Sequence, residues 1–148
     1  MIPMPSTKIA FVEYKVIDEP WNLYKLADGT VIRLRIILGG LIKENDTDFS
    51  AQSTRVFNVI PDDKYVGVPS VPLKPDEKVE DYIEAEDLKI LEKTDKWNEY
   101  EIGSEKVMLS IKGELVSVSR TSRHDRKGIP VYVTNVQLLV KHKKTKSE

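Results

Sequence analysis

Residues 21–26 read WNLYKL, and residues 97–102, which lie 76 positions further along the chain, read WNEYEI. A run rich in β-branched residues follows each copy, so the recurrence extends over several strands. An internal repeat of this kind predicts two tandem antiparallel β units of about fifty residues each. Six residues define the repeated motif: Trp21, Asn22, Tyr24, Trp97, Asn98 and Tyr100.

The first unit is residues 1–60. Segment 8–17 is rich in β-branched and aromatic residues, which is typical of a strand. After the motif, Asp28 and Gly29 predict a tight type I′ hairpin turn, which requires two residues of positive φ. The returning strand alternates, so one face carries Ile32, Leu34, Ile36 and Leu38 while the other carries Arg33 and Arg35.

Glycines predict where the long strands bend. Gly39 and Gly40 lie near the end of the first long strand, and segment 53–60 then closes the unit as a further strand. The second unit, residues 87–140, repeats this plan with a long strand from 107 and a bend at Gly113. Beyond that bend we expect Val116 and Val118 to carry the apolar face, followed by a basic loop at 119–127 and a last strand at 131–140.

A proline-rich connector, residues 61–86, separates the units. It contains four of the eight prolines, which predicts extended, irregular backbone. Segment 75–85 has acids just after a proline, which favours a short helix. Residues 141–148 are polar and predict a flexible basic tail. Neither unit buries much core alone, so we expect one compact all-β domain, with at most one short helix, packed as a pseudo-twofold barrel or sandwich.

The composition is that of a globular protein, with 40% hydrophobic and 32% charged residues. No apolar run approaches the roughly 18 residues that span a bilayer, so no membrane partner is expected. Cysteine is absent, which excludes disulfides and thiolate chemistry within the sequence. Residues 1–6 lack the pattern of a secretory signal, so we expect a cytoplasmic location. Abundant Lys and Glu beside only two glutamines favour a thermophile.

The repeated motif has two interpretations. Large aromatic residues that occur in both units are typical of core anchors, and the asparagines are typical of turn backbone partners. The alternative is a pair of aromatic platforms for bases, sugars or proline-rich peptides. We favour the structural interpretation, because residues needed by both units serve folding more often than one function. Function is then expected where the units differ.

Charge is the largest difference between the units. The net charge is −1, yet residues 76–105 hold 12 acids and 4 bases, while residues 106–148 hold 10 bases and 3 acids. Basic residues on a β scaffold predict a nucleic-acid surface formed by the loop 120–127 and the tail. Its members are Arg120, Arg123, Arg126, Lys127, Lys141, Lys143 and Lys144. The alternative is a solvated hairpin tip with a solubilising tail.

Catalytic and metal sites are not predicted. Ser122, His124 and Asp125 are neighbours on one loop, and such neighbours do not aim at one another as a triad requires. The other histidine, His142, lies at the far end of the last strand, so no catalytic residue, metal ligand or cofactor is assigned. We therefore expect a non-catalytic module that binds a protein partner or a second copy. The alternatives are a nucleic-acid binder and, third, an enzyme with a site between the halves.

Overall fold

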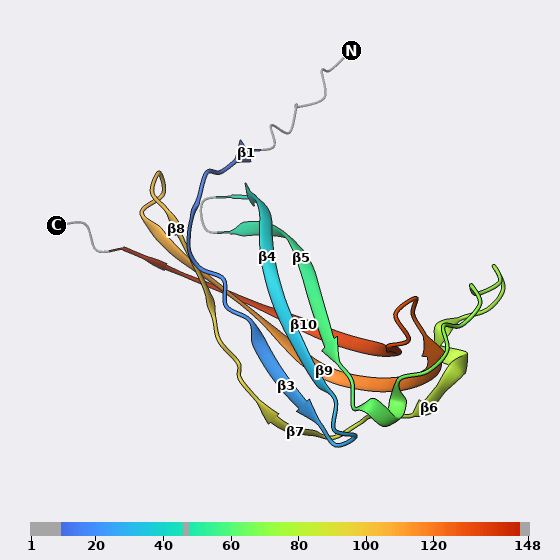
Figure 1. Ribbon diagram of the computed structural model, residues 1–148. Coiled ribbons are helices and arrows are strands. Elements are labelled where there is room, and N and C mark those ends of the chain that lie inside the picture. The colour runs from blue at the N-terminus through green and yellow to red at the C-terminus, as the bar shows by residue number, and fades with distance from the viewer. Residues whose placement is uncertain (1–9, 46–47, 146–148) are drawn as a thin grey trace, which may run out of the picture.

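The computed structural model describes residues 10–45 and 48–145, and it is all-β as predicted. Two five-stranded antiparallel sheets form, and neither closes into a barrel (Figure 1). The first sheet contains β1 (Ala10–Phe11), β3 (Asn22–Leu26), β4 (Val31–Lys43), β5 (Phe49–Ile60) and β7 (Ile90–Lys93). The second sheet contains β2 (Lys15–Asp18), β6 (Ile83–Ala85), β8 (Asn98–Ile102), β9 (Val107–His124) and β10 (Pro130–Lys144).

One long strand organises each sheet. β5 pairs along the whole of β4, so β3 and β1 share the opposite edge of β4. In the second sheet β10 pairs along β9, and β8 and β6 share its other edge. Two short strands join the sheet that the other half of the chain builds: β2 pairs with β8, and β7 pairs with β3.

The core lies between the two sheets, where both motifs and both long strands meet. Tyr24 and Tyr100 are fully buried, and the alternation predicted for β4 is observed. The buried residues of β4 are Ile32, Leu34, Ile36 and Leu38 before the bend and Leu41 after it. Arg33 and Arg35 lie on the opposite face, with their guanidinium carbons 4.4 and 5.9 Å from the centre of the Trp21 ring.

The hairpin turn after the first motif differs from the type I′ prediction. Gly29 has φ +88°, but Asp28 is not among the described residues with positive φ. The Leu26 N–H donates to Thr30 O at 2.9 Å, and the Gly29 N–H donates to Leu26 O at 3.0 Å. The loop therefore has three residues and ends on a glycine in the left-handed region, the alternative hairpin geometry.

The bend predicted at Gly39 and Gly40 coincides with a register shift between Leu38 and Gly40. In β9 the irregularity next to the predicted bend lies at Val116 rather than at Gly113, because Leu115 pairs with Val136 and Ser117 pairs with Asn135; a second shift lies between Pro130 and Tyr132 of β10. Val116 is the extra residue of this bulge and is 53% exposed. The expectation that Val116 faces the core was wrong, although Val118 is fully buried.

The connector contains no α-helix. Its helical turns are η1 (Asp63–Tyr65) and η2 (Val79–Tyr82), both of the 3₁₀ type. The short helix predicted within 75–85 takes the form of the four-residue 3₁₀ helix η2, which ends where Ile83–Ala85 pairs with β9 as β6.

Three further boundaries depart from expectation. The strand expected at 8–17 divides into β1 and β2, which belong to different sheets, and residues 8–9 lie outside the described part. The predicted basic loop is mostly strand, since β9 continues to His124. β10 includes residues 141–144, the first part of the segment predicted as a tail, and residues 146–148 lie outside the described part.

Candidate functional site

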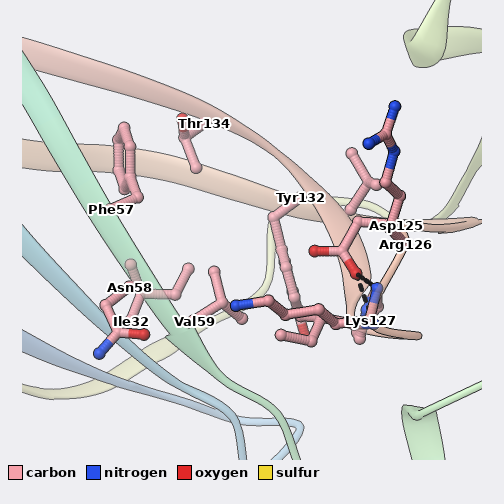
Figure 2. A pocket seen from close by; sticks show the side chains of 12 residues that line it. Ile32, Phe57, Asn58, Val59, Asp125, Arg126, Lys127, Tyr132 and Thr134 are labelled. Carbon is pink, nitrogen blue, oxygen red and sulfur yellow. Dashed lines mark hydrogen bonds between the residues drawn. The ribbon is translucent and has the colours of Figure 1, made fainter.

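A cavity of about 580 Å³ opens between β5 of the first sheet and β10 of the second, and we call it the groove. Its lining is largely apolar and aromatic, with charged residues on one side (Figure 2). Three adjacent residues come from β5, and the rest come mainly from β10 and the turn before it. The lining residues are Ile32, Phe57, Asn58, Val59, Asp125, Arg126, Lys127, Ile129, Pro130, Val131, Tyr132 and Thr134.

The turn between β9 and β10, which we call the tip, is built by Asp125. Its Oδ1 accepts hydrogen bonds from the backbone N–H of Lys127 at 2.8 Å and of Ile129 at 3.0 Å. Gly128 supplies the positive φ of +80° that this tight turn requires. The carboxylate of Asp125 is therefore occupied in holding the backbone of the tip.

The two cations of the tip point in different directions. Figure 2 shows the Lys127 side chain extending across the groove towards Val59, while the Arg126 guanidinium points away from it. None of the ion pairs between described residues includes either cation. Lys127 is thus a positive charge, without an ion-pair partner in the described chain, placed over an apolar groove.

The floor of the groove rests on a buried polar cluster. The Tyr132 hydroxyl lies 2.9 Å from both Asp28 Oδ2 and Thr30 Oγ1. Arg120 Nη1 donates to Asp28 Oδ2 at 2.8 Å, and its Nε donates to Glu84 Oε1 at 3.0 Å. The side chains of Asp28 and Arg120 are only 3% and 11% exposed. This cluster joins the hairpin of the first sheet to β9, β10 and β6.

Hydrogen bonding fixes the protonation of this cluster. Burial alone would raise the pKa of Asp28, but hydrogen bonds from the Thr30 N–H, Tyr132 and Arg120 outweigh it, so the pKa is lowered. Burial raises the pKa of Tyr132, and the hydrogen bond to the Asp28 carboxylate raises it further. Asp28 is therefore ionised and Tyr132 protonated near neutral pH, which makes the cluster a fixed support.

The connector covers the far side of the tip. Gly67 N donates to Gly128 O at 3.0 Å, and Ser70 N donates to His124 O at 3.1 Å. His124 Nε2 lies 2.8 Å from Tyr65 O. The end of β9, the tip and the start of the connector thus form one hydrogen-bonded assembly.

The structure separates the basic residues predicted as a nucleic-acid surface. The Arg120 guanidinium stacks 3.7 Å from the Tyr65 ring centre, besides its two ion pairs. Arg123 donates to Val71 O and lies 5.0 Å from the Tyr82 ring centre. Both arginines are therefore used within the molecule.

The remaining predicted cations lie at opposite ends of β10. Arg126 and Lys127 lie in the tip, whereas Lys141, Lys143 and Lys144 pair with Ser110, Met108 and Val107 near the other end of the sheet. Eleven residue steps of a strand separate Pro130 from Lys141, which is roughly 36 Å. The Lys141 ammonium lies 4.1 Å from the Trp97 ring centre.

The repeated motifs reach across the core to the opposite sheet. Asn22 Nδ2 donates to Gly113 O at 3.4 Å, and the Tyr24 hydroxyl accepts from the Leu115 N–H at 3.2 Å. In the other direction Asn98 Nδ2 donates to Ile36 O at 2.7 Å. Each motif thus binds the backbone of the long strand that the other half supplies.

The second motif also holds a buried acid. The Tyr100 hydroxyl donates to Glu19 Oε2 at 2.7 Å and accepts from Asn98 Nδ2 at 2.8 Å. Trp21 and Trp97 are half-buried, and each lies under cationic side chains of its own sheet. None of the six motif residues lines the groove.

Sequence reasoning missed the groove and its support. The sequence pattern predicts only a closing strand for Phe57 and Val59 and only a turn for Asp28. Asp28 meets Arg120 and Tyr132 across 92 and 104 positions, so no local spacing signals the cluster. The one feature of the sequence that points to the groove is the lack of charged residues from 129 to 140, which lie along β10.

Within residues 10–45 and 48–145, no group of three or more His, Asp or Glu side chains has a geometry that would hold a metal ion. In the same part of the chain, no helix has the length and apolar character needed to cross a membrane. Comparison with protein-family models, with curated proteins and with solved structures finds no match.

Proposed function

We propose that this protein is a non-catalytic protein-binding module whose groove holds an extended segment of protein between β5 and β10. The observation that carries the proposal is the pair of long edge strands that border one apolar groove. Within the described residues, β5 pairs only with β4, and β10 pairs only with β9. The outer backbone edges of both strands are therefore free to accept another strand.

These edges lack the usual protection against pairing. Natural edge strands are commonly short or carry charges that discourage the addition of another strand. β5 has twelve residues and a single charged one, Arg55. β10 has fifteen residues, and the first eleven, from Pro130 to Val140, carry no charge. Edges of this length and composition favour β-augmentation, in which backbone hydrogen bonds supply affinity.

The side chains of the groove suit an extended apolar ligand. Phe57 is 37% exposed, and Tyr132 lies across from it on β10 (Figure 2). A volume of about 580 Å³ lies within the usual range of ligand sites, roughly 300–1,000 Å³. Lys127 adds one positive charge over the groove, which favours a segment that carries a carboxylate.

Binding explains these residues better than catalysis does. An acid–base site needs groups that are free to exchange a proton with a substrate. Asp125 holds the tip, Asp28 accepts from Arg120, and Tyr132 has a raised pKa. Nucleic-acid binding is the weaker alternative, because Arg120 and Arg123 are engaged internally and the other cations divide between the two ends of β10.

We also propose that the two halves are copies of one five-strand unit, related by a pseudo-twofold axis. The pairing pattern supports this: β1 and β6 each join the long strand of their own half, and β2 and β7 each cross to the other sheet. β5 and β10 are then equivalent strands, the last of each unit. The groove lies between these equivalent edges.

Panning a displayed library of random nine-residue peptides against the full chain tests the proposed binding function. We expect enriched peptides with alternating apolar residues, and binding at least roughly tenfold weaker to F57R than to the unmodified chain, since a charge then occupies the groove. V116R is the matched control, because Val116 is also an exposed apolar residue but does not line the groove. Absence of enrichment, or equal binding to F57R, would overturn the proposal.

A further inference from the structure

We infer that the segment bound in the groove is the connector of a second copy of this chain, residues 71–81, so that two copies bind each other reciprocally. This inference rests on the proposed protein-binding function and names its partner. It follows from the exposure, the proline spacing and the charge of the connector, together with its position beside the groove.

The connector is an exposed apolar segment. Val68 is 84% exposed and Val71 is 76% exposed, and Leu73 is 37% exposed. Figure 1 shows this part of the chain projecting beyond the end of the second sheet that carries the tip. Three such side chains close together on a projecting segment are typical of an interaction surface.

The backbone of the connector suits a groove with aromatic walls. Pro69, Pro72 and Pro75 recur at every third position, and no strand or helix forms from 66 to 78. This spacing matches the three-residue turn of a polyproline II helix as far as the turn at 75–76, where the Glu77 N–H donates to Lys74 O at 3.0 Å. Segments of this kind bind grooves lined by aromatic side chains, here Phe57 and Tyr132. Pro72 and Pro75 have no N–H to donate to a strand edge, so this partner binds chiefly through its side chains, in place of strand addition.

Charge complementarity selects the same partner. The connector carries Asp76, Glu80 and Asp81, which are exposed and belong to no ion pair between described residues. Lys127 over the groove has no such ion-pair partner either. An acidic segment following an apolar one therefore matches a groove that is apolar and ends in a cation.

The position of the connector makes a reciprocal dimer feasible. Hydrogen bonds from Gly67 to Gly128 and from Ser70 to His124 hold the start of the connector against the tip, whose residues line the groove. Connector and groove thus lie at the same end of one molecule. A twofold axis beside the tip brings each connector to the groove of the other copy, which is the self-complementary contact of a symmetric dimer.

A charge-swap experiment on the full chain tests this inference by sedimentation velocity. The unmodified chain is expected to form a dimer that weakens as salt is raised, because charges contribute to the contact. K127E alone and E80K/D81K alone are each expected to weaken the homodimer at least roughly tenfold, since each places like charges in contact. An equimolar mixture of the two variants is expected to form heterodimers, because both reciprocal contacts then join opposite charges.

K25E is the matched control, since Lys25 is an exposed lysine whose ion pair with Glu92 lies outside the groove. A chain that is monomeric at every concentration, a K127E dimer as strong as the K25E dimer, or a mixture without heterodimers would each overturn the inference. Library peptides that still require Phe57 would then leave the binding function in place with a different partner. If no peptide is enriched either, or if F57R binds the peptides as strongly as the unmodified chain, the binding function is overturned as well.

Discussion

Replacing Asp28 with alanine removes the carboxylate that supports the floor of the groove. Asp28 accepts hydrogen bonds from the Thr30 N–H, the Tyr132 hydroxyl and Arg120 Nη1. Breaking a buried ion pair by removal of one partner costs about 3–5 kcal/mol. We expect about 3 kcal/mol for D28A, at the lower end of this range, because Arg120 keeps its contact with the half-exposed Glu84.

Urea unfolding followed by tryptophan fluorescence measures this free energy. The slope with denaturant is expected to stay unchanged, since the variant exposes the same surface on unfolding. The control is E92A, which removes an ion pair whose side chains are 58% and 71% exposed and costs less than about 1 kcal/mol. A cost for D28A as small as that of E92A would refute the buried cluster as a support.

The dependence of stability on pH gives a second test of Asp28. The folded state lowers the pKa of Asp28, so its ionised form stabilises the fold at any pH above the unfolded pKa of about 3.9. That contribution is lost as the pH falls through the lowered folded pKa. Wild-type protein is therefore expected to lose more stability than D28N between about pH 5 and the folded pKa, and parallel curves would contradict the shift.

Two further substitutions test the inter-sheet contacts by the same unfolding assay. G113A is expected to lower the free energy of unfolding by about 1–3 kcal/mol, because a Cβ there would lie 2.6 Å from Cγ1 of the buried Ile36. The control is G103A, where a Cβ would have nothing within 4 Å, so stability is expected to change little. Equal effects of the two substitutions would contradict the close packing. Y24F is expected to lower the free energy of unfolding by about 1–3 kcal/mol, since the buried N–H of Leu115 loses its acceptor. A Y24F variant as stable as the unmodified chain would show that the motif does not join the sheets.

Local patterns predicted the strands and the buried face of β4. Alternation over 32–38 suffices for this, because the direction of a side chain in a strand depends only on its position in the sequence. The bulge at Val116 escaped prediction because it depends on the pairing of β9 with β10. The helix expected in the connector is limited to the 3₁₀ helix η2 for a related reason: the next residue, Ile83, pairs with Thr121, which is far from it in the sequence.

The site was less predictable than the fold. The sequence shows the number of cations in 120–127 but not their partners, so it predicts one basic surface that includes Arg120, Arg123 and Lys127. In the structure Arg120 forms an ion pair with Asp28, and Arg123 donates to Val71 O. The groove requires two strands from different sheets, and Phe57 and Tyr132 meet there only after folding. The sequence does indicate that its two halves differ in charge around the tip, where Lys127 lies.

Amide hydrogen exchange of the full chain, compared between dilute and concentrated protein, tests the central claim that the groove holds the connector of a second copy. We predict slower exchange at high concentration in residues 57–60, 129–134 and 71–81, and unchanged exchange in β2 and β7. Exchange that does not change with concentration in the groove and the connector, or protection confined to β2 and β7, would contradict the claim.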